Sequence, residues 1–327
     1  FTLLCAVLLI ACGGAPEDGS APQTALKQVP RNRTFISDCL SDGCAGQFKD
    51  YDSFHPYQPG VTTTTGFNFL YEPLYFYNAY SANGDITPWI AEGHAFNKDY
   101  TQVTIRIRPG VEWSDGHPWT AHDLVFTINL LKAHAPTLLF SVDMDKWVKE
   151  AVALDDLTAQ ITLTAPNPRF VFSYFTHNFD NGVPIVPKHI YEGTDFANNP
   201  ANATPIGTGP FKFKEWVKGS HIHLVKNEDY YVDGLPYLDE VFYRVIPDAA
   251  ARAVAFETGE VDVLPGGSVE NWDIPRLAEM DGVCVTEKGW EFLAPLAWMW
   301  LNNREGPTAN EKFRQAVMYA MDREFMR

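Results

Sequence analysis

Strand and helix signals follow one another along this chain, and that succession limits the fold more than any other feature. Val103, Ile105 and Ile107 alternate with polar residues, which predicts a strand that buries one face. A helix is predicted next, because Thr120 can cap its start with Asp123 at the third helical position, and apolar residues follow at helical spacing. Strands interspersed with helices predict the α/β class, with irregular order and long loops.

The same patterns predict further elements toward the C-terminus. Asp155-Asp156 reads as a turn, and Gly259 ends a short helix at a favoured capping position. Strands are predicted over residues 102–107, 158–164, 221–226, 241–246 and 261–264, and helices from 120, over 249–257 and over 310–323. The last helix carries an apolar stripe of Phe313, Ala316, Val317, Ala320 and Met321.

The first segment has the composition of an export signal. Residues 1–11 are apolar and uncharged, and they are too few to span a bilayer as a helix. The run Leu9-Ile10-Ala11-Cys12, followed by two glycines, resembles the lipobox of bacterial lipoproteins. We therefore expect a signal-peptide remnant at 1–11 and lipidation of Cys12. An ordinary signal peptide or a buried apolar strand is the alternative.

Cysteine usage agrees with export only weakly. Cys39 and Cys44 are close enough to form a small loop disulfide outside the cytoplasm, and two unpaired thiols are the alternative. Cys284 lies between two valines on an expected strand, which predicts a core residue.

Charge and aromatic content narrow the function. The chain has 327 residues and a net charge of −16, which argues against nucleic-acid binding, because that needs clustered Lys and Arg. Aromatic residues make up 14% of the chain and include nine Trp. They form either a large aromatic core or an aromatic-lined ligand cleft.

Catalytic and cofactor motifs are missing from the sequence. It contains no Gly-x-Ser-x-Gly, no His-Glu-x-x-His and no phosphate-binding loop. The Gly-rich run 207–210 is expected to be a tight turn into a strand, because Pro210 removes an amide donor. His221 and His223 share a strand face but lack a third ligand, so an exposed pair is expected rather than a metal site. Glu260 and Asp262 are expected to be solvated charges. We expect no enzyme activity, no cofactor and no metal.

A series of short blocks carries a family resemblance. The run Arg108-Pro109-Gly110-Val111-Glu112-Trp113-Ser114-Asp115-Gly116 is one of them, and the others occupy positions within 118–126, 184–188, 205–211, 215–216, 227–231, 236–239, 246–252, 259–262, 312–316 and 320–324. In this order, from about residue 61 to the end, they strongly resemble the family 5 extracellular solute-binding proteins, which include oligopeptide- and dipeptide-binding proteins of ABC importers. Ala309-Asn310 replaces the family's usual paired Asp, so Asn310 is expected to cap the last helix.

The resemblance implies a periplasmic-binding-protein-like type II bilobal fold with mixed sheets and an extra subdomain. The implied parts are a signal remnant (1–11), a lipid-anchored tether (12–31), the first lobe (32–69 and 188–295), an inserted subdomain (70–187), and a hinge strand with the start of a second lobe (296–327). Family members continue well beyond this point, so we expect the C-terminal part of the fold, and one wall of the cleft, to be absent from this chain.

The resemblance also implies a mechanism and a site. Two lobes close on a solute as a clamp, and a membrane permease recognises the closed form. The residues that resemble cleft-facing positions are Gly60, Val61, Thr62 and Thr63 in one loop, and Trp298, Trp300 and Asn302 on one face of a crossing strand. The alternative for both Trp residues is core packing between the lobes, and the alternative for Asn302 is a strand-end cap.

The leading hypothesis is a lipid-anchored, exported, monomeric solute-binding protein that delivers peptides to ABC permease subunits. A nickel chelate, a sugar or another small solute remains an alternative ligand. An exported hydrolase with an aromatic cleft, or a sensor that reuses the fold, is an alternative function.

Overall fold

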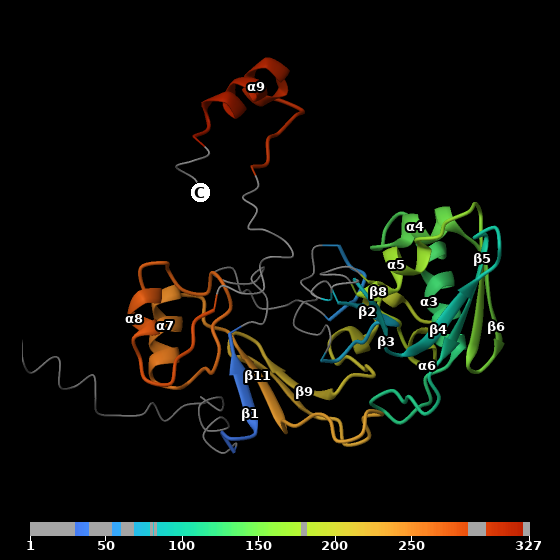
Figure 1. Ribbon diagram of the computed structural model, residues 1–327, viewed down its shortest axis with the longest axis horizontal. Helices are drawn as coiled ribbons and strands as arrows, with labels where there is room; N and C mark the ends of the chain where they lie inside the picture. Colours follow the sequence, from blue (N-terminus) through green and yellow to red (C-terminus); the bar gives the residue numbers. More distant parts are fainter. Residues whose placement is uncertain are drawn as a thin grey trace, which may run out of the picture. The chain divides into compact units, whose positions relative to one another are not determined.

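The computed structural model describes residues 30–38, 54–59, 69–78, 81, 84–177, 182–286 and 299–322. The chain divides into two compact units, Phe1–Val283 and Cys284–Arg327, whose elements are labelled in Figure 1. The elements mix helices with strands in three sheets, as the sequence predicts. Among the described residues, no helix has both the length and the apolar character needed to cross a bilayer.

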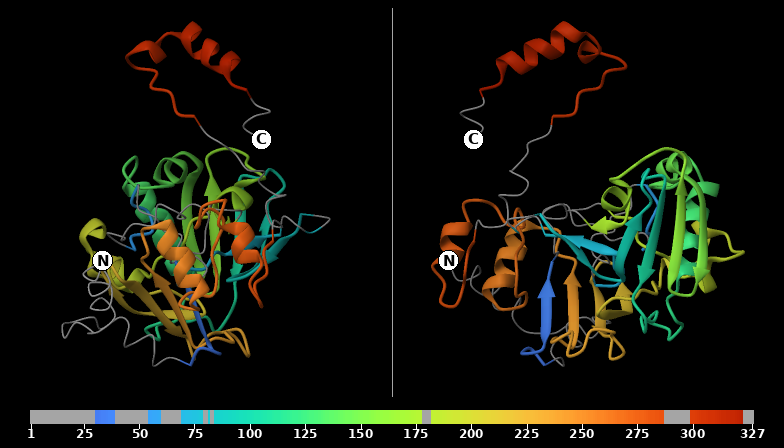
Figure 2. Two further views of the ribbon diagram at one scale, coloured as in Figure 1. Left: turned by 90° about the vertical axis from the view of Figure 1, so that its left-hand side faces the viewer. Right: turned by 45° about the vertical axis from the view of Figure 1, so that its right-hand side comes forward.

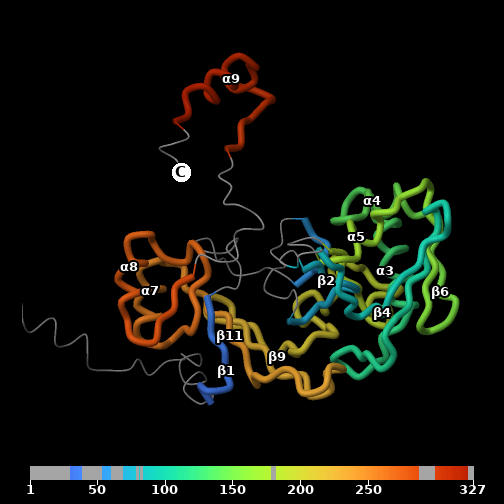
Figure 3. Tube along the Cα trace, viewed as in Figure 1, coloured from blue at the N-terminus to red at the C-terminus, as the bar shows by residue number. Residues whose placement is uncertain are grey.

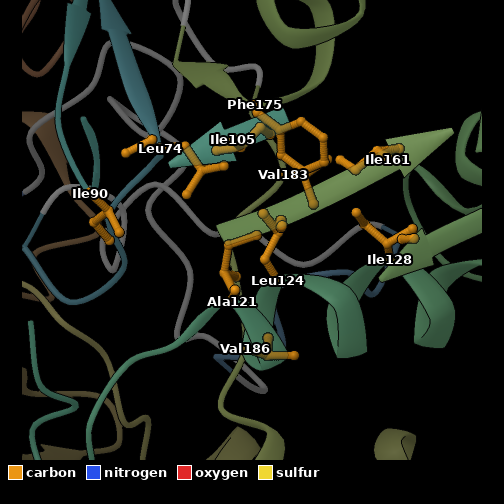
Figure 4. Packing of buried hydrophobic residues seen from close by; sticks show 14 of the residues in the cluster. Leu74, Ile90, Ile105, Ala121, Leu124, Ile128, Ile161, Phe175, Val183 and Val186 are labelled. Atoms are coloured by element: carbon orange, nitrogen blue, oxygen red, sulfur yellow. The ribbon is translucent and has the colours of Figure 1, made fainter. Parts of the chain in front are cut away.

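The first sheet is an antiparallel sheet in the order β4-β5-β7-β6. Its strands are β4 (Ala91–Phe96), β5 (Gln102–Ile107), β7 (Thr158–Leu163) and β6 (Val148–Asp155). The predicted strand at β5 is confirmed, because Val103, Ile105 and Ile107 are fully buried. Helices α3 (Ala121–Ala133) and α4 (Ser141–Trp147) pack on this sheet. Figure 4 shows Leu124 and Ile128 of α3 in the same cluster as Ile161 of β7.

The predicted start of α3 is also confirmed. The Thr120 backbone N–H donates to Asp123 Oδ2 at 2.8 Å, which satisfies a donor that precedes the helix. The other oxygen of Asp123 accepts the Lys188 backbone N–H at 2.8 Å. Lys188 opens α6 (Lys188–Tyr191), so one buried carboxylate ties the starts of two helices together.

The second sheet joins the beginning of the chain to a much later segment. Its order is β1-β11-β10-β9, from β1 (Thr34–Ser37), β11 (Glu240–Arg244), β10 (His221–Lys226) and β9 (Phe211–Val217). Strands β1 and β11 run parallel, and the other neighbours are antiparallel. Figure 2 shows blue β1 beside orange β11.

One predicted strand beside this sheet is shorter than expected. Residues 261–264 form only an isolated bridge between Val263 and Ser37. Asp262 accounts for the difference, because its side chain accepts the Ile36 backbone N–H at 2.7 Å and pairs with Arg31 at 2.6 Å. The Asp262 side chain thus takes the place of a ladder hydrogen bond. It is hydrogen-bonded and ion-paired, in contrast to the solvated charge that the sequence predicts.

Helix α7 (Ala249–Glu257) begins at Asp248, whose side chain accepts the Ala251 backbone N–H at 2.8 Å. It carries the buried Arg252, which faces the buried Asp38 with Nε and Oδ2 3.4 Å apart. The Arg252 Nη1 donates to the Ile246 carbonyl at 2.6 Å, and its Nε donates to the Ser268 carbonyl. The Ser268 hydroxyl donates to Asp38 at 3.1 Å. An ion pair with several additional hydrogen bonds is therefore enclosed at this end of the unit.

The third sheet is small, in the order β3-β2-β8. Its strands are β3 (Ile86–Pro88), β2 (Tyr75–Tyr77) and β8 (Thr176–His177). The remaining elements of the first unit are short: α5 (Phe170–Tyr174), η2 (Phe196–Asn198), η3 (Pro200–Asn202) and α8 (Ile274–Ala278). The course of the backbone between them can be followed in Figure 3.

The second unit holds η4 (Pro307–Ala309) and α9 (Glu311–Ala320). The predicted cap is confirmed, because Asn310 Oδ1 accepts the Lys312 backbone N–H at 2.9 Å. No residue of α9 is buried, so its apolar stripe stays accessible in the unit as described. Residues 299–302 form no strand, which differs from the extended crossing segment predicted there.

The prediction for Cys284 is wrong. Residues 283–286 are not in a strand, and the Cys284 thiol is free and exposed. The flanking valines suggested burial, but a run of three apolar residues does not determine whether a partner strand is present.

Candidate functional site

Most of the predicted solute-facing residues lie outside the described residues. These are Gly60, Val61, Thr62, Thr63 and Trp298, and the same holds for the predicted lipidation and disulfide residues Cys12, Cys39 and Cys44. Two predicted positions are described, both in the second unit. Trp300 has 84% of its surface exposed, and Asn302 is exposed beside it in the chain.

Asn302 organises the turn that precedes η4. Its Oδ1 accepts the Arg304 backbone N–H at 2.9 Å, and its backbone carbonyl accepts the Thr308 hydroxyl at 2.6 Å. The first bond uses the side-chain oxygen and the second uses the backbone carbonyl, so neither bond involves the Nδ2 group. Asn302 therefore has a structural role, yet it keeps a donor that can face a ligand.

Phe69 and Leu70 lie in a segment that is held firmly. The Gly209 backbone N–H donates to the Leu70 carbonyl at 3.0 Å, and the Phe211 N–H donates to the Phe69 carbonyl at 3.1 Å. A Cβ on Gly207 would lie 1.8 Å from the Leu70 carbonyl oxygen, and one on Gly209 would lie 2.2 Å from that of Phe69. The predicted entry into the strand at Phe211 is confirmed, and the glycines are needed for close backbone approach.

A buried carboxyl group follows this segment directly. Glu72 is 4% exposed, and its Oε1 accepts from Trp89 Nε1 at 2.7 Å and from the Tyr230 hydroxyl at 2.6 Å. The Thr208 and Tyr231 hydroxyls also lie near this carboxyl group. Burial raises the pKa of Glu72 to about 7, and the hydrogen bonds from Tyr230 and Trp89 oppose that shift. Three of the side chains around this carboxyl group are aromatic: Trp89, Tyr230 and Tyr231.

Glu72→Gln is expected to remove a pH dependence of stability. The raised pKa means that the folded state keeps its proton while the unfolded state loses one between pH 4.5 and about 7. Wild-type stability should therefore fall over that range, by roughly 2–3 kcal/mol from this group. Relative to wild type, Glu72→Gln should gain stability as the pH rises from 4 to 8, measured by urea unfolding. Glu92→Gln on the exposed face of β4 is the control, and a constant difference across pH would contradict the prediction.

The structure corrects the prediction for His221 and His223. Both are buried rather than exposed, and burial lowers the pKa of each. His223 Nε2 lies 2.7 Å from Glu240 Oε2, and its ring stacks on Phe242 with centroids 3.9 Å apart. Strand alternation correctly predicted the shared face, but it could not show that the Phe242 ring of the flanking strand packs against both imidazoles. Both imidazoles are therefore packed against Phe242, and each has a polar partner, Ser220 for His221 and Glu240 for His223.

Three polar residues come together at the turn after Trp113. Trp113 is buried, its backbone N–H donates to the His117 carbonyl at 2.8 Å, and Glu112 pairs with Pro118 in an antiparallel bridge, so the chain forms a tight hairpin here. Asp115 on this turn lies 2.7 Å from His189 Nε2 and 3.3 Å from His117 Nδ1. Within the part of the chain that the structure describes, this is the one trio of His, Cys, Asp or Glu whose donor atoms all lie within 4.8 Å of one another. The sequence does not reveal this trio, because 74 positions separate Asp115 from His189, and the only local signal is Asp-x-His.

Comparison with known proteins gives a family match. Residues 85–327 match the model for bacterial extracellular solute-binding proteins, family 5 Middle. The oligopeptide-binding protein AppA of Bacillus subtilis is 32% identical over 67% of this chain and 39% of its own length. The glutathione-binding protein GsiB of Pectobacterium atrosepticum is 28% identical over 72% of this chain and 43% of its own. The chain thus spans less than half the length of these relatives.

Solved structures agree on the fold. The structure of Bacillus subtilis AppA in complex with a nonapeptide aligns with a TM-score of 0.63 at 26% identity, covering 76% of this chain and 46% of that one. NikZ from Campylobacter jejuni in complex with Ni(L-His) aligns with a TM-score of 0.71 at 22% identity, covering 90% of this chain and 54% of that one. The second likeness shows the fold alone.

Proposed function

Because the chain belongs to the bacterial extracellular solute-binding proteins of family 5, we propose that it captures a peptide for an ABC importer and delivers it unaltered to the permease. The family match over residues 85–327 carries this proposal. The peptide, rather than another solute, is supported by the AppA relative, whose structure was solved with a nonapeptide at 26% identity to this chain.

The proposed mechanism is closure of two lobes on the solute. We assign Gly60, Val61, Thr62 and Thr63 to one wall of the cleft, and Trp298, Trp300 and Asn302 to the segment that connects the lobes. A ligand that contacts both walls only in the closed state shifts the equilibrium by the difference between its affinities for the two states. An extended peptide can pair its main chain with the protein as an added strand, which leaves side-chain identity open. The firm seating of Phe69 and Leu70 on the Gly207–Gly209 segment supports a fixed first wall.

The direct test of the proposed function is retention of intact peptide. The protein is incubated with a mixed peptide library, separated from free peptide, and analysed by native and denaturing mass spectrometry. Retained peptides of unchanged mass are expected, and Ni(L-His) or an oligosaccharide should not displace them. Recovery of cleaved peptide would overturn the proposal in favour of a hydrolase, and retention of only the nickel chelate or sugar would overturn the peptide assignment.

Trp300→Ala is expected to weaken peptide binding about tenfold, or ~1.4 kcal/mol, because an exposed aromatic side chain that becomes covered by ligand contributes strongly. Trp272→Ala is the matched control, since Trp272 is 76% exposed and belongs to the other unit. Isothermal titration calorimetry measures both variants. Equal affinities for the two would remove Trp300 from the proposed site.

Asn302→Asp separates a binding role from a structural one. The aspartate keeps the oxygen that accepts the Arg304 N–H, but it lacks the amide donor. An unchanged melting temperature with several-fold weaker peptide binding is expected. Unchanged peptide binding would show that Asn302 stabilises the turn before η4 and does not contact the ligand.

We also propose that Cys12 carries the lipid anchor, with residues 12–31 as its tether and the protein on the periplasmic or cell-surface face of a bacterial membrane. The support is the apolar run that ends in Cys12 and is followed by Gly13-Gly14. Cells that express the protein should incorporate labelled palmitate into it, and Cys12→Ser should abolish the label. Cys5→Ser is the control and should keep it. Label that persists in Cys12→Ser would refute the anchor.

A further inference from the structure

Asp115, His117 and His189 form a cluster that the proposed function does not use. The Asp115 carboxylate stands between two imidazoles, with one oxygen toward each ring. The rings of His117 and His189 stack with centroids 4.0 Å apart and planes 20° apart. Two imidazoles and a carboxylate are a donor set that suits divalent transition metals, whereas Mg²⁺ and Ca²⁺ prefer oxygen donors.

The two segments that supply these donors are fixed by other contacts. On the turn, the Gly116 backbone N–H donates to the Trp113 carbonyl at 2.8 Å, and the Ser114 N–H donates to the Gly207 carbonyl at 2.8 Å. Gly116 has a φ of +85°, a backbone conformation that suits glycine. On the other side, α6 is held by the hydrogen bond from Lys188 to Asp123. The donors therefore start close together without relying on a mobile chain.

The distances are near those that a bound ion requires. A tetrahedral zinc ion with bonds of about 2.1 Å separates its donor atoms by roughly 3.4 Å. Here Asp115 Oδ1 lies 3.3 Å from His117 Nδ1, and the other oxygen, Oδ2, lies 2.7 Å from His189 Nε2. One donor atom from each of the three residues lies within 4.8 Å of the others. An ion enters if the shorter contact opens slightly and the stacked rings tilt apart. The His117 side chain is 59% exposed, so it has room to turn. The chain's net charge of −16 also favours a cation.

We propose that Asp115, His117 and His189 form a binding site for a divalent transition metal ion of the Zn²⁺ class, which pins the turn after Trp113 to α6. Three protein ligands leave a further coordination position for water. The ion replaces the imidazole–carboxylate hydrogen bonds and cross-links two segments that lie far apart in the sequence. The site involves none of the residues proposed for solute binding.

Zinc titration of the purified chain tests the proposal directly. Calorimetry in chelator-free buffer at pH 7.5 should give one saturable Zn²⁺ site, and Mg²⁺ should give none. His117→Gln and His189→Gln should each weaken Zn²⁺ binding by at least tenfold, since even changes behind the direct ligands weaken metal sites by about 10–100-fold. His122→Gln is the matched control, because His122 also pairs with an aspartate, at 3.4 Å from Asp156, but has no second imidazole in that pair.

A second measurement separates a metal site from a merely hydrogen-bonded cluster. Co²⁺ should give visible absorption bands of a low-coordinate site with nitrogen and oxygen ligands, and the His117→Gln, His189→Gln double variant should lose them. Zn²⁺ should raise the melting temperature of the wild type but not that of the double variant. The proposal is overturned by the absence of saturable Zn²⁺ binding in the wild type, or by equal Zn²⁺ binding in the double variant.

Discussion

Arg252→Met is expected to lower the free energy of unfolding by about 3–5 kcal/mol, because it removes the guanidinium that balances the buried Asp38 carboxylate. Both side chains are almost completely buried, so water cannot replace the lost ion pair. The substitution also removes the donors to the Ile246 and Ser268 carbonyls. Chemical denaturation monitored by circular dichroism measures the effect.

Two further variants determine the cause of this loss. Asp38→Asn combined with Arg252→Met removes the negative charge together with the positive one, so the double variant should be more stable than Arg252→Met alone. Arg276→Met is the surface control, since the Arg276 side chain is 53% exposed where it pairs with Asp273 and Glu257, and ion pairs at the surface contribute about 0–1 kcal/mol. If the double variant is no more stable than the single one, packing of the Arg252 side chain, and not its charge, holds this region together.

Gly207→Ala is expected to destabilise the protein by about 3 kcal/mol or more, since the added methyl group meets backbone and not a flexible side chain. The Cβ would lie 1.8 Å from the Leu70 carbonyl oxygen, so the two segments must separate. Their separation breaks the hydrogen bonds from Gly209 to Leu70 and from Phe211 to Phe69. Thermal and urea unfolding of the variant measure the loss.

Gly93→Ala provides a matched control for this substitution. Gly93 lies in β4, and a Cβ placed there meets nothing within 4 Å. Its stability should stay within about 0.5 kcal/mol of the wild type, as for most surface changes. Equal losses in the two variants would show that close approach at Gly207 is not what requires glycine.

The elements that the sequence predicted well are those whose signals are local. The buried strand at Val103, Ile105 and Ile107 follows from alternation, and the start of α3 follows from the pairing of Thr120 with Asp123. Asn310 caps α9 for the same kind of reason. In each case the interacting groups lie within a few residues of one another, so the pattern itself contains the structural cause.

The errors arose where a distant segment decides the outcome. His221 and His223 share a strand face as predicted, but their burial depends on the strands and the Phe242 ring beside them. The strand expected at 261–264 is reduced by a side chain of Asp262 that bonds to Ile36. The Asp115, His117 and His189 cluster was missed because the fold, and not the sequence spacing, brings its members together. Of the proposed solute-facing residues, only Trp300 and Asn302 are described, so the assignment of that site stays a prediction.

The pairing of β1 with β11 has a consequence for the order of events during synthesis. The hydrogen bond from Ile36 to Asp262 spans 226 positions in the chain. At roughly 5–20 residues per second, a ribosome needs on the order of 10–45 s to make the intervening segment. During this time β1 has no partner, whereas the β4-β5-β7-β6 sheet, built within residues 91–163, can already assemble. The newly made chain therefore carries a folded middle portion before β1 is paired. Strand β1 stays accessible to other factors until its partner β11 has emerged from the ribosome.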